Sequence, residues 1–333
     1  MKTGRKSGGA VSLATIAEAA NVSISTVSRI VNGQTHRASA QTAERVRQAI
    51  EELGYQPNQI GRALKQGKTR VVAMLTANLN NPVMSTIASA TEAALRDIGY
   101  VMTLCDTHDR EDLQDEYLQA MRAQAVQGYI LVTNIRSPGL AEIVARKEPV
   151  VFACRRNPYK PGAFVGIDNL QAGAAAADYL WSHGCREPAV VFPANGSAVT
   201  EERVAGFCAR MSALGVPASR ITKAAAPGNF HLEVGYAAAR TLPDGAPWPK
   251  GMLCVSDQIA YGVYRCARER NLRIPEDCLI VSIDGSELNS WIAPWLKSIQ
   301  VPYRDFGLPI VEQLQTIWNG GEPGEVILPF SVD

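Results

Sequence analysis

The sequence predicts two parts of different fold class: an all-α helix-turn-helix headpiece, followed by an α/β core of two doubly wound parallel-sheet subdomains. Residues 11–56 contain capped helices whose apolar residues recur three and four apart. From Val71 onward short apolar strands alternate with helices, and this alternation runs through the chain twice. The charge is also divided, because residues 1–69 carry ten Lys and Arg against four Glu, whereas the whole chain has a net charge of +1.

A basic head on an acidic remainder predicts that the head contacts a polyanion. The alternative is chance clustering of charge on a solvated face. The Gly- and Lys-rich residues 1–10 are expected to form a disordered basic arm and not a signal peptide. No run reaches the roughly 18 apolar residues of a membrane span. Seven cysteines form no C-x-x-C pair, which is typical of reduced thiols and predicts a cytoplasmic protein.

Two short helices and a tight turn are predicted at the start of the head. Ser12 and Ser23 are expected to cap the helices, and Asn21 tolerates the left-handed turn between them. The inward residues are predicted to be Leu13, Ile16, Ala17 and Ala20 of the first helix and Val27, Ile30 and Val31 of the second. The second helix of such a unit enters the major groove of DNA.

A third helix is predicted between a Ser39 cap and a Gly54 stop. Its expected apolar stripe is Ala43, Val46, Ile50 and Leu53. Residues 57–69 follow as a predicted hinge helix and linker that starts at Pro57. So short a helix is marginal in water, and Gly61 costs about 1 kcal/mol relative to Ala. We therefore expect the hinge to order only on DNA.

The head resembles the headpiece and hinge of the LacI/GalR (lactose-repressor) family. The resemblance is carried by Val22-Ser23, Ser25-Thr26-Val27-Ser28-Arg29, Asn32-Gly33, Gly54-Tyr55, Pro57-Asn58 and Arg62-Ala63-Leu64. It implies that Ile24, Ser25 and Arg29 read bases, that Ser23, Thr26, Ser28 and Asn32 hold phosphates, that Asn58 belongs to the interface, and that Leu64 wedges into the minor groove. The alternatives are a linker role for Leu64 and helix packing for Ile24. Gly61 and the longer loop at residues 33–39 depart from the family pattern.

In the core, strands are predicted at Val71–Leu75, Tyr100–Cys105, Gly128–Val132, Val150–Ala153 and Phe164–Gly166, and again at Ala189–Phe192, Ile221–Ala224, Gly251–Val255 and Leu279–Ile283. The predicted helices are Val83–Ile98, Asp112–Ala125, Leu140–Arg146, Glu201–Leu214, Leu232–Leu242, Ile259–Glu269 and Phe306–Trp318. Two successive sheets predict a ligand held in the crevice between them.

The family resemblance extends over this core. Its motifs are Asn80-Asn-Pro82, Asp168-Asn169, Glu202-Arg203, Gly206-Phe207, Ser256-Asp257, Ala260, Gly262, Ile274-Pro-Glu-Asp277 and Ile283-Asp284-Gly285. They imply a periplasmic-binding-protein-like fold, in which the chain crosses between subdomains near Asp168, near Ser298 to Val301 and near Glu322 to Val326. Subdomain 1 is thus expected at about 70–167 and 299–323, and subdomain 2 at about 168–297 and 324–333.

By the same resemblance, the effector-binding positions are Val83, Met84, Arg155, Arg203, Phe230, Ser256, Asp257, Asp284 and Tyr303. Arg203 and Asp284 offer a charged donor and acceptor for hydroxyls or a carboxylate, and their alternative is an interdomain salt bridge. The alternative for Phe230, Met84 and Val83 is that they only pack in the core or at the rim. The alternative for Arg155 is that the neighbouring Arg156 takes its place in the site. Cys154, Ser256 and Gly285-Ser286 replace polar residues usual in the family. The extra arginine suggests an anionic effector, such as a sugar acid.

The resulting hypothesis is a DNA-binding regulator, by resemblance a repressor, that acts as a homodimer on a palindromic operator and responds to a sugar, sugar acid or other carboxylate. A transport-type binding protein without a DNA role is the alternative. An enzyme is not expected, because the catalytic motifs of hydrolases, kinases and dinucleotide enzymes are missing. The isolated histidines predict no metal site, and no cofactor is expected. Asp106-Thr-His-Asp109 is interpreted as a loop rim. Effector identity, operator sequence and the dimer or tetramer choice stay open.

Overall fold

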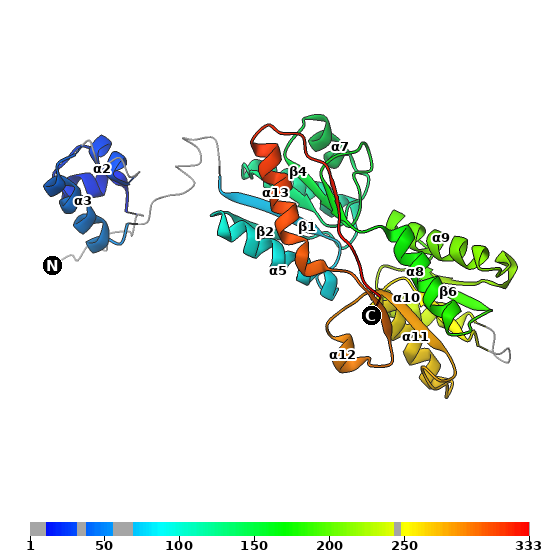
Figure 1. Ribbon diagram of the computed structural model, residues 1–333. Helices are drawn as coiled ribbons and strands as arrows, with labels where there is room; N and C mark the ends of the chain where they lie inside the picture. The colour runs from blue at the N-terminus through cyan, green and yellow to red at the C-terminus, as the bar shows by residue number, and fades with distance from the viewer. Residues whose placement is uncertain (1–10, 32–37, 56–68, 243–247, 333) are drawn as a thin grey trace. The chain divides into compact units, whose positions relative to one another are not determined.

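A computed structural model describes residues 11–31, 38–55, 69–242 and 248–332. The chain divides into two compact units, Met1–Thr69 and Arg70–Asp333. The first unit is all-α and the second is α/β, with the element order shown in Figure 1. The predicted hinge segment, including Asn58, Gly61 and Leu64, lies outside the described residues.

Three helices form the described part of the first unit: α1 (Leu13–Ala19), α2 (Ile24–Val31) and α3 (Ala40–Glu52). The predicted caps are present, because the Ser12, Ser23 and Ser39 hydroxyls accept from the amides of Thr15, Thr26 and Thr42 at 3.2–3.3 Å. Asn21 adopts the predicted left-handed turn with φ 51°. The cap and turn chemistry of the sequence therefore determines this local structure.

The core of the first unit differs from prediction at one end of α3. Ile16, Ala17, Ala20, Val27, Ile30, Ala43 and Val46 are buried as predicted, together with Ala49 and Tyr55. Leu53, predicted to be in the stripe, caps α3 and is 37% exposed. Gly54, with φ +60°, reverses the chain there and turns Tyr55 inward in its place.

The first sheet of the second unit has the strand order β11-β5-β4-β3-β1-β2, with every pairing parallel. Its strands are β1 (Val71–Thr76), β2 (Val101–Asp106), β3 (Gly128–Leu131), β4 (Val150–Ala153), β5 (Phe164–Gly166) and β11 (Glu325–Ile327). Val72 and Met74 face the helices α5 (Pro82–Asp97) and α13 (Gly307–Trp318), whereas Ala73 and Leu75 face α6 (Glu111–Ala123) and α7 (Pro138–Ala145). Helices on both faces make this sheet doubly wound.

The second sheet has the order β10-β9-β8-β6-β7 and is also parallel throughout. Its strands are β6 (Pro188–Pro193), β7 (Thr222–Ala226), β8 (Gly251–Cys254), β9 (Leu279–Asp284) and β10 (Lys297–Gln300). Its helices are α8 (Asn169–Ser182), α9 (Ala198–Ala213), α10 (His231–Arg240) and α11 (Asp257–Glu269), with the short α12 (Asn289–Ile292) between β9 and β10. The predicted fold class is confirmed, and α8, α12, β10 and β11 are the α-helices and strands of the described core that were not predicted.

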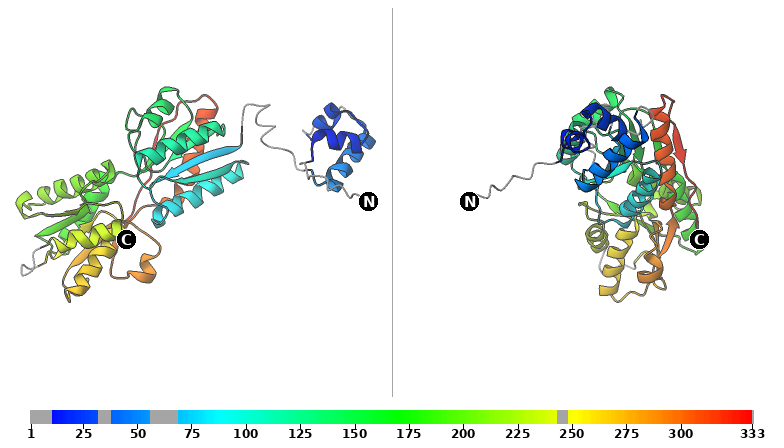
Figure 2. Two further views of the ribbon diagram at one scale, coloured as in Figure 1. Left: turned by 180° about the vertical axis from the view of Figure 1, so that it is seen from behind. Right: turned by 90° about the vertical axis from the view of Figure 1, so that its left-hand side faces the viewer.

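The crossings between the two sheets join the subdomains into one unit (Figure 2). The first lies between Gly166 of β5 and Asn169 of α8. The second follows Gln300, so the predicted start of subdomain 1 at residue 299 is too early. The third lies between Ile327 of β11 and Ser331, which pairs with Gln300. Assigning residues 324–333 to subdomain 2 was therefore wrong for β11, because the partner of a short edge strand is chosen by long-range pairing that no local pattern encodes.

Two glycines allow α8 and α9 to pack in backbone contact. A Cβ at Gly173 would lie 2.1 Å from the carbonyl oxygen of Arg203, and one at Gly206 would lie 2.0 Å from that of Leu170. Only glycine fits at these two positions. Their close approach brings the start of α8 next to Arg203, which lines the cavity described below. No helix within the described residues is long and apolar enough to cross a membrane.

Candidate functional sites

The outward face of α2 is the candidate DNA-reading surface. Ser23, Ile24, Ser25 and Arg29 are exposed, and Ile24 exposes 53% of its surface. The packing alternative for Ile24 therefore fails within this unit, since Val27 and Ile30 supply the core contacts of α2. The exposed Ile24 and Arg29 side chains suit the major groove, in which thymine methyl groups and guanine edges are accessible.

The other predicted contact residues divide into two groups. Thr26 and Ser28 are half-buried, and Thr26 Oγ1 lies 2.9 Å from Ser23 Oγ. These hydroxyls lie on the first turns of α2, where phosphate-binding hydroxyls and amides are commonly found. Asn32, Asn58 and Leu64 lie outside the described residues, and their roles stay predictions.

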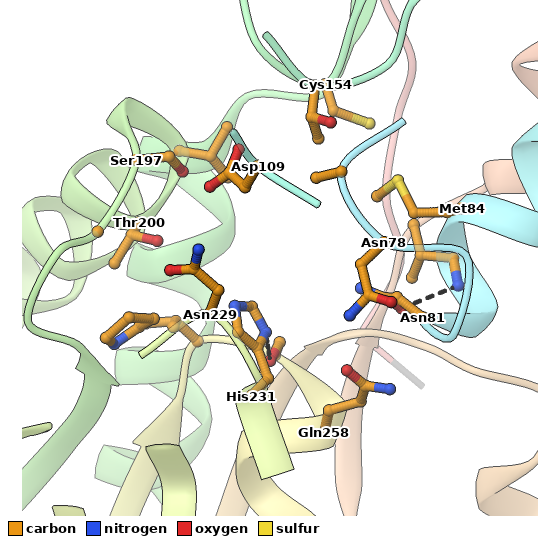
Figure 3. Close-up of a pocket in the computed structure, with 18 of the residues that line it drawn as sticks. Asn78, Asn81, Met84, Asp109, Cys154, Ser197, Thr200, Asn229, His231 and Gln258 are labelled. Carbon is orange, nitrogen blue, oxygen red and sulfur yellow. Dashed lines mark hydrogen bonds between the residues drawn. The ribbon is translucent and has the colours of Figure 1, made fainter. Parts of the chain in front are cut away.

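A cavity of about 360 Å³ lies between the two sheets of the second unit. Loops at the carboxyl ends of strands line it, as expected of a ligand crevice in parallel sheets. Of the nine predicted effector residues, eight line this cavity: Val83, Met84, Arg155, Arg203, Phe230, Ser256, Asp284 and Tyr303. In Figure 3, Asn78 and Met84 lie across the cavity from Thr200 and Asn229, and Asp109 lies beside Ser197.

Arg203 and Asp284 form a buried, hydrogen-bonded pair on the cavity wall. Arg203 Nη1 lies 3.4 Å from Asp284 Oδ1 and donates to the Val255 carbonyl at 2.6 Å. Arg203 Nε donates to Asn169 Oδ1 at 3.0 Å, and the Tyr303 hydroxyl donates to Asp284 Oδ1 at 2.9 Å. Arg203 and Asp284 are 7% and 5% exposed. The pair is therefore held rigidly, so its remaining polar edges have fixed directions for a ligand.

The protonation of Asp284 reflects this burial. Burial raises the pKa of the Asp284 carboxyl to about 7, although the Arg203 charge opposes the rise. The nearby Asp257 carboxylate adds to the rise, and the Tyr303 hydroxyl lowers the pKa through its hydrogen bond. Burial also raises the pKa of the Tyr303 hydroxyl well above its ordinary value. The phenol therefore stays protonated and acts as a donor to Asp284.

Asp257 does not line the cavity, so its prediction as an effector ligand was wrong for this structure. Its Oδ1 accepts from the Ser282 and Ser298 hydroxyls, and its Oδ2 accepts from the Ser286 amide and Asn289 Nδ2 at 2.7 and 2.9 Å. Four donors occupy this carboxylate. It ties α11 to β9, β10 and α12, which is a structural role that the adjacent Ser256 does not share.

His231, which is an isolated histidine in the sequence, lies in the cavity wall. Its Nδ1 is 2.9 Å from Ser256 Oγ, which also accepts the Ile259 amide at the start of α11. That hydroxyl hydrogen is thus free to point to Nδ1, which leaves Nε2–H toward the cavity (Figure 3). Burial, and then the charges of Arg203 and Arg155, lower the pKa of His231 to about 4. The imidazole is therefore neutral at neutral pH.

The two neighbouring arginines after β4 take different directions. Arg155 lines the cavity, and its Nη1 lies 2.8 Å from Asp109 Oδ1. Arg156 instead pairs with Glu325 of β11 at 3.2 Å. Both cavity arginines, Arg155 and Arg203, have a carboxylate partner, which offsets the positive charge that suggested an anionic effector.

Several cavity residues were not predicted. They are polar residues in the loops after β1, β2, β6 and β7, together with Gln258 of α11: Asn78, Asn80, Asn81, His108, Asp109, Asn195, Ser197, Asn229 and Gln258. The rule that ligands bind at the carboxyl ends of parallel strands was the signal that would have found them. Within the described residues, no group of three His, Cys, Asp or Glu side chains is placed to hold a metal ion. All seven cysteines are free thiols, and burial raises the pKa of Cys154 in the cavity wall to about 12.

Known proteins share this architecture over most of the chain. The HTH-type transcriptional regulator DegA of Bacillus subtilis is 29% identical over 296 residues, which cover 88% of this chain and 87% of DegA. The Ribose operon repressor of Halalkalibacterium halodurans is 29% identical over 292 residues, which cover 88% and 86%. The crystal structure of the Lac repressor dimer bound to operator and the anti-inducer ONPF superposes with a TM-score of 0.85 at 24% identity, over 97% of each chain.

A helix-turn-helix unit in one chain with a two-sheet core that surrounds a cavity defines a class of DNA-binding regulator. Residues 12–58 match the family model of bacterial regulatory proteins, lacI family, and residues 177–331 match that of the periplasmic binding protein-like domain. The chain belongs to the lacI family of bacterial regulatory proteins.

Proposed function

We propose that this protein is a transcription repressor that binds operator DNA through α2 and changes its operator affinity when a small molecule occupies the cavity between its sheets. The observation that carries the proposal is a ligand-sized, polar-lined cavity in the same chain as an exposed recognition helix. We propose repression, and not activation, because one of the relatives is named a repressor. The transport-protein alternative is not favoured, because it has no use for the helix-turn-helix unit.

In DNA reading, Arg29 donates two parallel hydrogen bonds to a guanine edge, and Ile24 contacts thymine methyls. Ser23, Thr26 and Ser28 hold phosphates and set the position of the helix in the groove. Asn32, Asn58 and Leu64 keep the roles that the family resemblance implies. Each base contact of this kind contributes about 1–3 kcal/mol of discrimination against a wrong base.

The cavity suits a hydroxyl-rich small molecule. Amide side chains of Asn78, Asn81, Asn229 and Gln258 line it, and each offers both donors and acceptors. The Arg203–Asp284 pair adds a charged donor and acceptor at 3.4 Å. Phe230 is 40% exposed at the cavity and offers an apolar face for a ring. A sugar or sugar derivative matches this mixture of polar edges and apolar faces.

Control of DNA binding follows from the position of the cavity. The ligand touches loops of both sheets, and the sheets are joined by three chain crossings, so occupancy favours one relative orientation of the subdomains. A ligand shifts this equilibrium only by the difference in its affinity for the two orientations. The chain enters the core at the start of β1, next to the segment predicted to be the hinge, so that orientation is transmitted toward the head.

The working form is a homodimer in the cytoplasm, and it carries out no catalysis. One recognition helix reads half a site, and two-fold symmetry provides the second half of a palindrome. The short α12 offers a contact face, because Leu288, Trp291 and Ile292 are 47%, 83% and 61% exposed. Adjacent large apolar side chains at this exposure are typical of an interface between subunits.

The test is selection of binding sequences from random duplex DNA by the full chain, followed by fluorescence anisotropy on the selected duplex. Palindromic sequences are expected, with affinity that falls steeply as salt rises. Arg29→Ala should weaken binding to the selected duplex by roughly 5- to 150-fold. Arg47→Ala is the control, since Arg47 lies on α3 and pairs with Glu44 at 3.3 Å. Absence of any enriched sequence, or equal losses in both variants, would contradict the proposal.

A further inference from the structure

The loop between β2 and α6 places the Asp109 carboxylate in the cavity wall, and its backbone adopts an unusual conformation there. His108 and Asp109 both adopt left-handed conformations, with φ 51° and 55°. Asp106 stabilises the loop by accepting from the Leu79 amide at 3.0 Å and from the His108 amide at 3.1 Å. Two consecutive non-glycine residues in this region are uncommon, and such conformations concentrate at functional sites.

Asp109 directs its carboxylate to Arg155. The two atoms Asp109 Oδ1 and Arg155 Nη1 are 2.8 Å apart, and the two side chains are 30% and 20% exposed. Arg155 is anchored through its backbone, since its carbonyl accepts from Asn134 Nδ2 at 3.0 Å. Both residues belong to the first sheet's side of the cavity, so the pair does not depend on the orientation of the two subdomains.

The pair balances the charge of the cavity. The remaining charged residues of the wall are Arg203 and Asp284. At pH 7.5, above the Asp284 pKa of about 7, the carboxyl is mostly ionised and offsets the Arg203 charge, while His231 is uncharged. His108 lies at the rim with its side chain 62% exposed. Removing the Asp109 charge would leave Arg155 as an unpaired cation facing the ligand.

We propose that Asp109 is a specificity-determining residue that sets the charge of the effector: paired with Arg155, it makes the cavity admit uncharged hydroxyl-rich molecules and reject their carboxylate counterparts. A ligand carboxylate would have to displace Asp109 from Arg155 and would lie beside a like charge. An unpaired partner charge and like-charge contact are the usual means by which a site rejects a competing ligand. This inference rests on the proposed small-molecule control of the protein.

The experiment compares the full-length protein with Asp109→Asn in thermal-shift and calorimetric titrations at pH 7.5. The probes are matched pairs of a neutral sugar and its uronic acid, which keeps the ring: glucose and glucuronate, and galactose and galacturonate. Asp112→Asn is the control, because Asp112 pairs with Arg110 on the exposed start of α6 and is not in the cavity wall. A double variant, Asp109→Asn with Arg155→Gln, removes both charges of the pair.

The wild-type protein should respond to a neutral sugar and not to its acid. Asp109→Asn should improve the ratio of acid to neutral affinity at least tenfold, Asp112→Asn should behave as wild type, and the double variant should lose the gain for the acid. Loss of the gain in the double variant would show that the gain depends on the Arg155 charge and not on a general disturbance of the fold. An unchanged melting temperature of Asp109→Asn without ligand would show the same.

Three results would overturn the inference: acid binding by the wild-type protein, no gain for acids in Asp109→Asn, or no response to any probe in any variant. Anisotropy on the selected duplex, measured on the same samples, separates the two levels of the proposal. If the wild-type protein binds the selected duplex and any of these three results is found, only the role of Asp109 is rejected. If the wild-type protein shows no sequence-specific DNA binding, the proposed function itself is rejected.

Discussion

Replacing Arg203 by alanine should destabilise the core strongly, because the arginine is buried among groups that need its charge. The change removes donors to Asn169, to the Val255 carbonyl and to Asp284 at 3.0, 2.6 and 3.4 Å. It also leaves the Asp284 carboxylate buried without its cation. Breaking a buried ion pair by removing one partner costs about 3–5 kcal/mol, and we expect a loss of unfolding free energy in that range.

Arg210→Ala is the matched control on the same helix. Arg210 pairs with Asp178 at 2.7 Å, but these side chains are 42% and 48% exposed. An exposed pair of this kind contributes about 0–1 kcal/mol, so the two variants should differ by at least about 2 kcal/mol. The contrast compares a buried with an exposed pair, since each joins an arginine of α9 to an aspartate of another element.

Urea unfolding followed by tryptophan fluorescence is the appropriate assay. All five tryptophans lie in the unit Arg70–Asp333, so the signal reports the core and not the head. Without Arg203 the pKa of Asp284 should rise further, because the opposing charge is gone, and the loss should be smaller at pH 5.5 than at pH 8.5. Equal destabilisation by Arg203→Ala and Arg210→Ala would refute the reasoning, as would a loss independent of pH.

Four further predictions concern other parts of the molecule. Between about pH 6.5 and 4, unfolded His231 takes up a proton that the folded protein does not, so stability falls as pH falls; His231→Gln should remove this loss in urea titrations at pH 4.5 and 7. The raised pKa of Asp284 acts in the opposite direction, because the folded protein keeps a proton that the unfolded chain releases at lower pH. The contribution of this proton to the free energy of unfolding is lost as pH rises to about 7, and Asp284→Asn should remove this pH dependence of stability. Trp291→Glu should convert the dimer to a monomer in sedimentation velocity, whereas an unchanged mass would exclude α12 from the interface. Ser23→Ala should destabilise α2 by about 0.5–2 kcal/mol, visible as faster amide exchange in that helix alone.

The headpiece was predictable because its signals are local. A serine cap, a left-handed asparagine and apolar residues three and four apart lie within a few residues of the structure they produce. The prediction was wrong at Leu53, where Gly54 reverses the chain and brings Tyr55 into the core. A reversal after a helix decides which of two nearby apolar residues turns inward, and periodicity alone does not decide this.

The strands of the core were also predictable, since buried parallel strands form short apolar runs. Their arrangement in two doubly wound sheets followed from the double strand–helix alternation. The edge strands β10 and β11 were missed because they are short and partly exposed, so neither forms the apolar run that marks a buried strand. Which strand such a segment joins depends on its partner across the sheet.

By itself, the sequence determined the fold class and the recognition helix, because caps, periodicity and family motifs are local features of the chain. It also predicted nine effector residues, of which eight line the cavity. Only the tertiary structure decided that Arg155 faces the cavity while Arg156 turns to Glu325, that Asp257 is occupied by four donors, and that Asp109 enters the site. The partners Asp109 and Arg155 are 46 residues apart, and Arg203 and Asp284 are 81 apart. Contacts over such separations are set by how the sheets pack, so the charge balance of the site is a property of the folded protein.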